Sequence, residues 1–304
     1  MSRHWAKKLD AGGIVVLDGA TGTELRRRGA ELDRRAWSGP AVLSHAELLT
    51  RIHADFLLAG ADVVTTNTFA TSRFVLRAAG LDERFEEINR AAVDAARRAR
   101  DLAGREADIA GSLSCLPPGF DTAAYPGARE EQDAYLELAT LLAEAGVDLL
   151  VLEMMEETRH ARRACEAARR VGLPFWLGVS ARRSPQHGRL TAYDFPNVAV
   201  AAVLDALLEL GPAAVNVMHT PPDAVDEALD AVTARWAGVV GAYPEISGTA
   251  AERSETAMAP EAFGAEARKW VARGARIVGG CCGTTPEHIR AVAEAVGASA
   301  PGPA

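Results

Sequence analysis

The sequence predicts an α/β protein, a single-domain (β/α)8 barrel of the TIM type that spans residues 1–297. Eight short apolar runs alternate with amphipathic helical segments, and this is the strand count of such a barrel. No phosphate-binding glycine fingerprint follows the first run, where the chain reads DGATGT from Asp18 to Thr23. This argues against a doubly wound sheet. A chain of 304 residues is also a common length for one barrel.

The expected strands are runs of mostly Val, Ile and Leu, as in strands that are buried on both faces. They are Ile14–Asp18, Asp62–Thr66, Asp108–Leu113, Asp148–Leu152, Phe175–Ser180, Ala213–Val217, Val239–Tyr243 and Arg276–Val278. Between them, seven segments repeat apolar residues at helical spacing. They are Ala46–Ala59, Glu83–Leu102, Glu130–Ala145, Thr158–Val171, Val198–Leu210, Pro222–Ala234 and Glu261–Ala272.

Two long segments follow expected strands and are predicted to be loops. Ser114–Arg129 contains several prolines and glycines, and Arg182–Asn197 is polar with further Pro and Gly. Loops after barrel strands lie at the face that carries the chemistry, so both are candidates for lids. Ordinary surface loops have the same composition, and the sequence leaves these alternatives open. The tail 298–304 is expected to be disordered.

The composition is that of a soluble globular enzyme, with 48% hydrophobic and 24% charged residues. A net charge of −8 argues against partners such as nucleic acid or an anionic membrane surface. The first residues lack the apolar core of a secretion signal, and no apolar stretch approaches the roughly 20 residues that span a bilayer. Four cysteines do not make a disulfide scaffold, so a cytoplasmic location is expected. Whether the chain forms homo-oligomers is left open.

A cysteine pair lies between the last expected strand and a helix, in the sequence GGCCGTTPEH from Gly279 to His288. Thr284 or Thr285 is expected to cap that helix. Neighbouring strand residues point to opposite faces, but the flanking glycines permit backbone conformations that let both sulfurs converge. Convergent thiolates suit a thiophilic metal, and zinc is the usual choice without redox chemistry. The alternative is a reduced, partly buried cysteine pair in a glycine-rich turn.

Two carboxylates stand at strand ends in an otherwise aliphatic barrel. Asp18 ends the first expected strand and Glu153 follows the fourth. A carboxylate there is costly unless it has a partner or a ligand. Either residue alone is explained equally well by the capping of a nearby loop or helix. Together, at the same rim as Cys281 and Cys282, they indicate a functional site.

Taken together, these residues resemble the homocysteine S-methyltransferase family. It includes betaine-dependent and S-methylmethionine-dependent enzymes and the homocysteine domain of methionine synthase. The matching segments are Asp18–Leu25, Ala36–Ser38, Ala61–Phe69, Ala145–Glu153, Val215–Asn216 and Gly279–Ile289. The last segment is the most specific, and its order relative to the others argues against a chance match. The family fold is a (β/α)8 barrel.

The resemblance implies an S-methyltransferase with a zinc ion that binds the thiolate of homocysteine. That sulfur attacks a methyl group of a sulfonium or quaternary ammonium donor, and methionine is formed. Both partners are small molecules. Cys281 and Cys282 match metal ligands and Glu153 matches a catalytic position. No proton moves in the methyl-transfer step, so the task of the enzyme is positioning and desolvation.

The resemblance also assigns substrate-binding residues. Glu153 and Asp18 match positions that hold the ammonium group of homocysteine. Trp37 and Phe69 fall in segments near the donor, where an aromatic face can meet a methylated cation. Two further residues of matching segments, Asn67 and Asn216, are expected at the substrate site.

One departure from the family pattern concerns the third zinc ligand. The family has Asn-Cys at the end of the sixth expected strand, and this chain has Asn216-Val217. Strand alternation puts His219 on the face of Val217, where its imidazole can complete a set of two thiolates and one nitrogen. Cys115, after the third expected strand, is a second candidate. In the third interpretation the site holds no tight metal.

Another departure is the pair Met154-Met155 after Glu153, which predicts a more apolar and adaptable pocket. The sequence therefore favours a methyltransferase and leaves two alternatives. One is a family member with a lost or altered zinc site that methylates a different nucleophile or acts on a methylated amino acid. The other is a non-catalytic ligand-binding homologue, which the retained Cys281, Cys282 and carboxylates disfavour.

Overall fold

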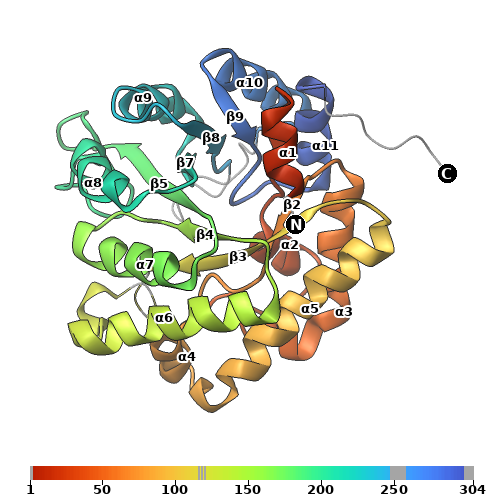
Figure 1. The fold of residues 1–304 in the computed structure, drawn as a ribbon, viewed down its shortest axis with the longest axis vertical. Helices are drawn as coiled ribbons and strands as arrows, with labels where there is room; N and C mark the ends of the chain where they lie inside the picture. Colours follow the sequence, from red (N-terminus) through yellow and green to blue (C-terminus); the bar gives the residue numbers. More distant parts are fainter. Residues whose placement is uncertain (1–2, 116, 118, 120, 247–257, 298–304) are drawn as a thin grey trace.

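Eight parallel strands form a barrel with helices around it in the computed structural model, which describes residues 3–115, 117, 119, 121–246 and 258–297 (Figure 1). The strands are β1 (Val15–Val16), β2 (Val63–Thr65), β3 (Asp108–Ser114), β4 (Leu149–Glu153), β5 (Phe175–Arg183), β7 (Ala214–Met218), β8 (Val239–Tyr243) and β9 (Ala275–Val278). Their order is β1-β9-β8-β7-β5-β4-β3-β2, and a parallel bridge from Leu17 to Val63 joins the two ends. The predicted (β/α)8 barrel is confirmed. The tail 298–304, predicted to be disordered, lies outside the described residues.

The helices confirm the seven segments expected from the sequence and add short ones. They are α1 (His4–Asp10), α2 (Thr21–Arg27), α3 (Ala41–Leu58), α4 (Arg73–Ala78), α5 (Phe85–Ala103), α6 (Ala128–Ala145), α7 (Thr158–Val171), α8 (Val200–Leu207), α9 (Pro222–Thr233), α10 (Pro260–Ala272) and α11 (Pro286–Ala295). Among the described residues, no helix has both the length and the apolarity to cross a bilayer.

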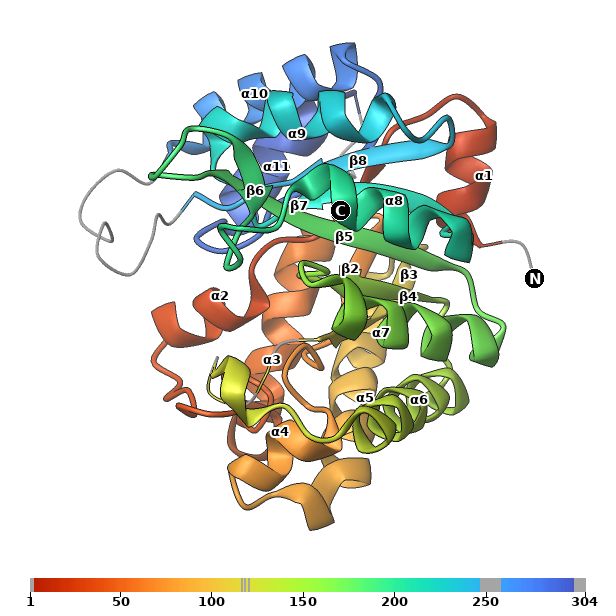
Figure 2. The same ribbon diagram turned by 90° about the vertical axis from the view of Figure 1, so that its left-hand side faces the viewer.

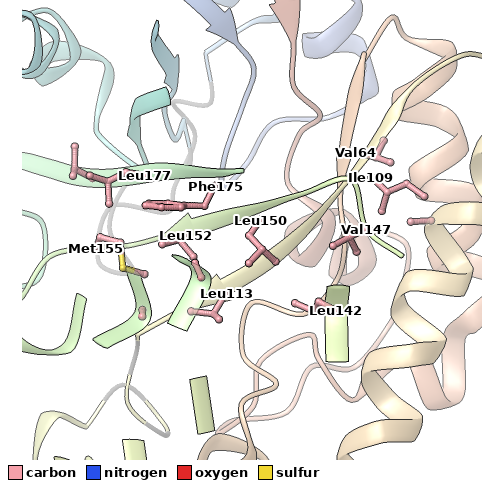
Figure 3. Packing of buried hydrophobic residues seen from close by; sticks show 14 of the residues in the cluster. Val64, Ile109, Leu113, Leu142, Val147, Leu150, Leu152, Met155, Phe175 and Leu177 are labelled. Atoms are coloured by element: carbon pink, nitrogen blue, oxygen red, sulfur yellow. The ribbon is translucent and has the colours of Figure 1, made fainter. Parts of the chain in front are cut away.

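Strand alternation divides the core into two layers. Along β4, Leu149 and Val151 point into the barrel, whereas Leu150 and Leu152 pack in the layer between the strands and the helices. Figure 3 shows part of this outer layer around β3, β4 and β5. Because both faces of each strand are buried, the strands are mostly apolar, which explains why they could be located in the sequence.

The amino-terminal end of the barrel is closed by α1, which lies at the end opposite to α2 in Figure 2. Trp5 of α1 belongs to the inner core and meets Trp176 of β5 edge-to-face, with 5.4 Å between the ring centroids. Asp108, at the start of β3, accepts a hydrogen bond from the backbone N–H of Trp5 at 2.6 Å. This end therefore belongs to the folded core.

The prediction of a loop over residues 182–197 is wrong in part. β5 continues to Arg183 and pairs antiparallel with a further strand, β6 (Leu190–Ala192), to form a hairpin beyond the barrel. Ala181 pairs with Ala192, and the backbone N–H of Tyr193 reaches the carbonyl of Ser180 at 3.3 Å. A three-residue strand is too short to show alternation against polar flanks, which explains why it was missed.

Candidate active site at the carboxyl end of the barrel

A cavity of about 640 Å³ opens at the carboxyl ends of the strands, where barrel enzymes carry their active sites. Residues at or after the ends of the strands line it. Among them are Asp18 after β1, Phe69 after β2, Glu153 of β4, Tyr193 after β6, His219 after β7, Tyr243 of β8, and Cys281 and Cys282 after β9. The structure thus brings the cysteine pair and both predicted carboxylates to one cavity.

The cysteine pair is held by a tightly packed turn. A Cβ atom on Gly280 would lie 2.4 Å from the hydroxyl oxygen of Thr284, so a larger residue would force the turn apart. That hydroxyl donates to the carbonyl of Cys281 at 2.7 Å, and the backbone N–H of Cys281 donates to the carbonyl of Pro244 at 2.8 Å. The turn has little freedom to move the sulfurs.

Helix α11 begins immediately after this turn. Thr285 is its N-cap, Pro286 opens its first turn, and a capping box joins Thr285 to His288. The expectation of a threonine cap is therefore confirmed, with Thr285 as the residue. The helix start fixes the far end of the cysteine turn.

Cys281, Cys282 and His219 form a three-residue group whose ligand atoms all lie within 4.8 Å of one another. The Nδ1 atom of His219 is 3.5 Å from the Sγ atom of Cys281. A tetrahedral zinc with ordinary Zn–S and Zn–N bonds requires about 3.6 Å between such atoms. Two sulfurs and one imidazole that face an open cavity match a catalytic zinc set, which keeps its fourth position for a ligand. The residues present therefore fit this metal.

The side chain of His219 points toward the two cysteines for a reason other than strand alternation. Val215 and Val217 of β7 point outward into the layer between strands and helices, so the face of Val217 is not the face of the cavity. His219 follows the strand with a φ of 45°, and this left-handed conformation redirects its side chain. The expectation that His219 would share the face of Val217 is wrong.

His219 is not the only residue of the cavity with a positive φ value. Among the described residues other than glycine, only Trp37, Met154 and His219 have them, and all three line the cavity. Such conformations cost about 1–3 kcal/mol each and persist where the surroundings enforce them. Their concentration here is typical of a functional site.

Cys115, the second candidate for the third ligand, is not in the group. Its thiol is buried in the outer layer and donates to the carbonyl of Met154 at 3.4 Å. Burial raises its pKa well above the usual value. The strand that carries Cys115 directs it between barrel and helices, so this candidate is ruled out by position.

The carboxylates Asp18 and Glu153 have neutral hydrogen-bond partners. Asp18 is 2% exposed and accepts from the backbone N–H of Thr65 at 2.7 Å and from its hydroxyl at 2.9 Å. Glu153 accepts from the hydroxyl of Ser112. Burial raises the pKa of Asp18 to about 8 and that of Glu153 to about 7. The cavity thus contains two acidic groups that a bound cation would stabilise in the charged form.

Around His219 the environment is also acidic. Burial alone would lower the pKa of His219, but the Cys282 sulfur and the carboxylates of Glu245 and Glu156 outweigh it and raise the pKa to about 9. A hydrogen bond with Cys282 and burial raise the pKa of Cys281 well above its usual value. This negative surrounding favours a bound cation at the three-residue group.

Several cavity residues were not predicted from the sequence, among them Tyr243, Tyr193 and Glu245. Tyr243 ends β8 beside the cavity, and its hydroxyl has no hydrogen-bond partner among the described residues. Its position at the end of an expected strand was the same signal that singled out Glu153. Tyr193 and Glu245 belong to no sequence motif, so nothing in the sequence indicated that they lie at the site.

The aromatic residues expected near the donor do line the cavity. Trp37 lies under the guanidinium of Arg26, whose carbon is 5.6 Å from the ring centroid, and Phe69 lies after β2. Asn67 also lines the cavity, but its amide is engaged with Ser38: its Nδ2 donates to the carbonyl and its Oδ1 accepts from the hydroxyl, both at 2.7 Å. Asn67 therefore orders the segment that carries Trp37.

Asn216 and Met155 are not at the cavity, contrary to expectation. The side chain of Asn216 is fully buried against β8, where a Cβ atom on Gly241 would lie 2.1 Å from its Oδ1. Met155 packs in the outer layer, as Figure 3 shows. Of the methionine pair, only Met154 lines the cavity. One of the two methionines therefore contributes to the apolar wall of the cavity.

Sequence comparison identifies relatives over almost the whole chain. Residues 15–296 match a family described as homocysteine S-methyltransferase. A homocysteine S-methyltransferase of Bacillus subtilis is 28% identical, and the alignment covers 94% of this chain and 95% of that protein. A selenocysteine methyltransferase of Astragalus bisulcatus is 29% identical over 93% of this chain and 92% of its own.

Structure comparison agrees with the sequence comparison. The metallated form of the homocysteine methyltransferase MmuM from Escherichia coli superposes with a TM-score of 0.77 and 26% identity. The match covers 94% of this chain and 97% of that one. A methyltransferase from Methanosarcina mazei shares the fold, with a TM-score of 0.59 and 14% identity.

Proposed function

Because the chain belongs to the homocysteine S-methyltransferase family, we propose that it methylates homocysteine with a zinc ion held by Cys281, Cys282 and His219. Its relatives are methyltransferases, and the chain is an enzyme of methyl transfer. The observation that carries the proposal is the 3.5 Å approach of the His219 Nδ1 atom to the Cys281 sulfur at the mouth of the cavity. This imidazole supplies the ligand that Val217 lacks.

The chemistry that zinc supplies when bound is deprotonation of the homocysteine thiol near neutral pH, which leaves the sulfur nucleophilic. In the transfer, the bond from that sulfur to the methyl carbon forms while the bond from the methyl carbon to the donor breaks. The donor leaves as a neutral sulfide or amine, and methionine is formed. The chain therefore needs no general base at the reacting atoms.

Asp18 and Glu153 bind the ammonium group of homocysteine in this proposal. Both lie at the cavity, and their partners are the hydroxyl or amide groups of Thr65 and Ser112, which carry no charge. An ammonium ion supplies the missing countercharge and the N–H donors. Its position relative to Cys281 and Cys282 then directs the substrate sulfur to the metal group.

Trp37 and Phe69 provide the aromatic faces for the methylated cation of the donor. Both line the same cavity as the cysteine pair. Bound donor and acceptor together exclude water from the reacting atoms, which strengthens every charge interaction there. The sulfonium and quaternary ammonium classes of donor share this requirement.

The test uses protein purified without chelator. Stoichiometric zinc, and methionine formed from homocysteine with S-methylmethionine, S-adenosylmethionine or betaine, are the expected results. Parallel assays with cysteine and selenocysteine define the acceptor. Activity that survives complete removal of metal would overturn the zinc proposal. Methyl transfer to an acceptor other than a thiol or selenol would instead indicate the altered-site alternative.

A further inference from the structure

The β5–β6 hairpin brings one side chain against the imidazole of His219. The ring centroids of Tyr193 and His219 are 4.6 Å apart, with the planes tilted by 55°. The Tyr193 hydroxyl donates to the Oε1 atom of Glu245 at 3.1 Å. Tyr193 is 7% exposed and Glu245 is 2% exposed, so this contact is formed inside the protein. The hydroxyl of Tyr193 is thus held by Glu245, two residues after β8, and the ring lies against the imidazole of His219.

The backbone of His219 is fixed as well. Its N–H donates to the carbonyl of Tyr243 at 3.3 Å, and the N–H of Glu245 donates to the carbonyl of Thr220 at 3.3 Å. The Thr220 hydroxyl donates to the carbonyl of Met218 at 2.9 Å and accepts from the N–H of Ala181 at 3.0 Å. These contacts with β5 and β8 hold the left-handed conformation of His219, which would otherwise be unfavourable.

The contacts of the His219 backbone leave the direction of its imidazole to be fixed by something else. Histidine in a zinc site must present one nitrogen at a fixed distance and direction, and rotation about its two side-chain torsions moves that nitrogen away. Residues that orient a metal-binding imidazole therefore contribute to metal affinity although they do not touch the metal. The Tyr193 ring is the aromatic group in contact with His219 in the described part of the chain.

We propose that Tyr193, anchored by Glu245, is the positioning residue that holds the His219 imidazole toward Cys281 and Cys282. The inference rests on the proposed zinc site and adds a role for the hairpin. Because Ala181 pairs with Ala192 and Tyr193 bonds Ser180 through its backbone, the hairpin is a fixed part of the site. This role differs from that of a lid, one of the two alternatives that the sequence left open for this segment, because an opening lid would carry Tyr193 away from His219.

The experiment compares Tyr193→Leu and Tyr193→Met, which remove the aromatic face, with Tyr193→Phe, which keeps it. Zinc affinity is measured by competition with a chromophoric chelator, and the d–d absorption of the Co²⁺-loaded protein reports the ligand geometry. Thermal unfolding of the metal-free proteins controls for the fold. Tyr193→Leu and Tyr193→Met are expected to bind zinc about 10-fold more weakly, with altered Co²⁺ bands.

Tyr193→Phe keeps the aromatic ring against His219 and loses only the hydroxyl that bonds Glu245, so its zinc affinity is expected to fall by no more than about threefold, with wild-type Co²⁺ bands. Wild-type affinity and bands in a folded Tyr193→Leu or Tyr193→Met protein would overturn the inference. So would a loss in Tyr193→Phe as large as in those two variants. The His219→Ala variant distinguishes a failure of the proposed zinc site from a failure of the proposed role of Tyr193. If His219→Ala keeps wild-type zinc affinity, the proposed zinc site itself fails; if it loses zinc while Tyr193→Leu does not, only the role of Tyr193 fails.

Discussion

Asp62 at the amino end of the barrel and Asp18 and Glu153 at its carboxyl end are buried carboxylates with opposite kinds of partner. At the amino end, Asp62 accepts from the ammonium of Lys8 at 2.6 Å and from the backbone N–H of Val16 at 2.7 Å. At the carboxyl end, Asp18 and Glu153 have no Lys or Arg partner within the described ranges. Burial accordingly raises the pKa of Asp18 to about 8 and that of Glu153 to about 7.

From this difference we infer that the amino end of the barrel contributes to stability and the carboxyl end to binding. The Asp62 carboxylate at the amino end is paired with Lys8 and connects α1 to β1 and the start of β2. Among the described residues, the carboxyl end has two buried carboxylates with no Lys or Arg partner, His219 with a positive φ, and a Tyr243 hydroxyl without a hydrogen-bond partner. Such groups lower stability and persist where binding requires them. Substitutions at the two ends should therefore separate activity from stability.

The largest effect is expected for Cys281→Ala. Mutation of a residue that only orients a metal ligand lowers metal affinity or activity by about 10- to 100-fold. Loss of a ligand itself should therefore lower kcat/KM by more than about 100-fold. Zinc content should fall in parallel, because two protein ligands remain. The matched control is Cys115→Ala, which removes a buried thiol that lies outside the metal group. Equal loss of activity in both variants would contradict the assignment of the site.

An intermediate effect is expected for Glu153→Gln. The amide keeps the shape but removes the charge that binds an ammonium ion, an interaction worth about 1.5–3 kcal/mol, or roughly 10- to 100-fold in kcat/KM. The free energy of unfolding of the metal-free protein should be unchanged or higher, because a buried carboxylate with no Lys or Arg partner among the described residues is removed. Steady-state kinetics with homocysteine, together with denaturant unfolding, measures both. A stability loss above about 3 kcal/mol with normal kinetics would refute the comparison.

The smallest effect on activity is expected for Asp62→Ala at the other end. The substitution leaves the buried N–H of Val16 without its acceptor and Lys8 without its carboxylate. We expect the free energy of unfolding to fall by about 1–3 kcal/mol. The value of kcat/KM should stay within about twofold, because the cavity lies at the opposite end of the strands. Denaturant unfolding and initial rates at one temperature test this.

Much of the fold could be predicted because its signals are local. Each barrel strand is apolar on both faces, and α7 was located to the residue at Thr158–Val171. The cysteine turn, Asp18 and Glu153 follow from their places after strands. The two-layer core explains these successes, because burial on both faces leaves a continuous apolar run in the sequence.

The failures concern contacts and backbone conformations that no local pattern encodes. The face of His219 depends on its φ of 45°, which reverses the alternation rule. β6 is a three-residue strand whose pairing depends on the extension of β5. The position of Tyr193 against His219 then depends on that pairing. Cys115 was misplaced because its direction after β3 could not be inferred from the strand end alone. Asn216 lies on the inner face of β7, between the outward-pointing Val215 and Val217, but it is fully buried and does not line the cavity, and the sequence does not encode this depth.

The most direct test of the central claim is the zinc content of four proteins purified without chelator: the wild type, His219→Ala, Cys281→Ala and Cys115→Ala. The account predicts one zinc per chain in the wild type and Cys115→Ala, and less than a tenth of that in the other two, because a catalytic zinc needs about three protein ligands. A wild-type protein without zinc, or a His219→Ala protein that keeps it, would contradict the account.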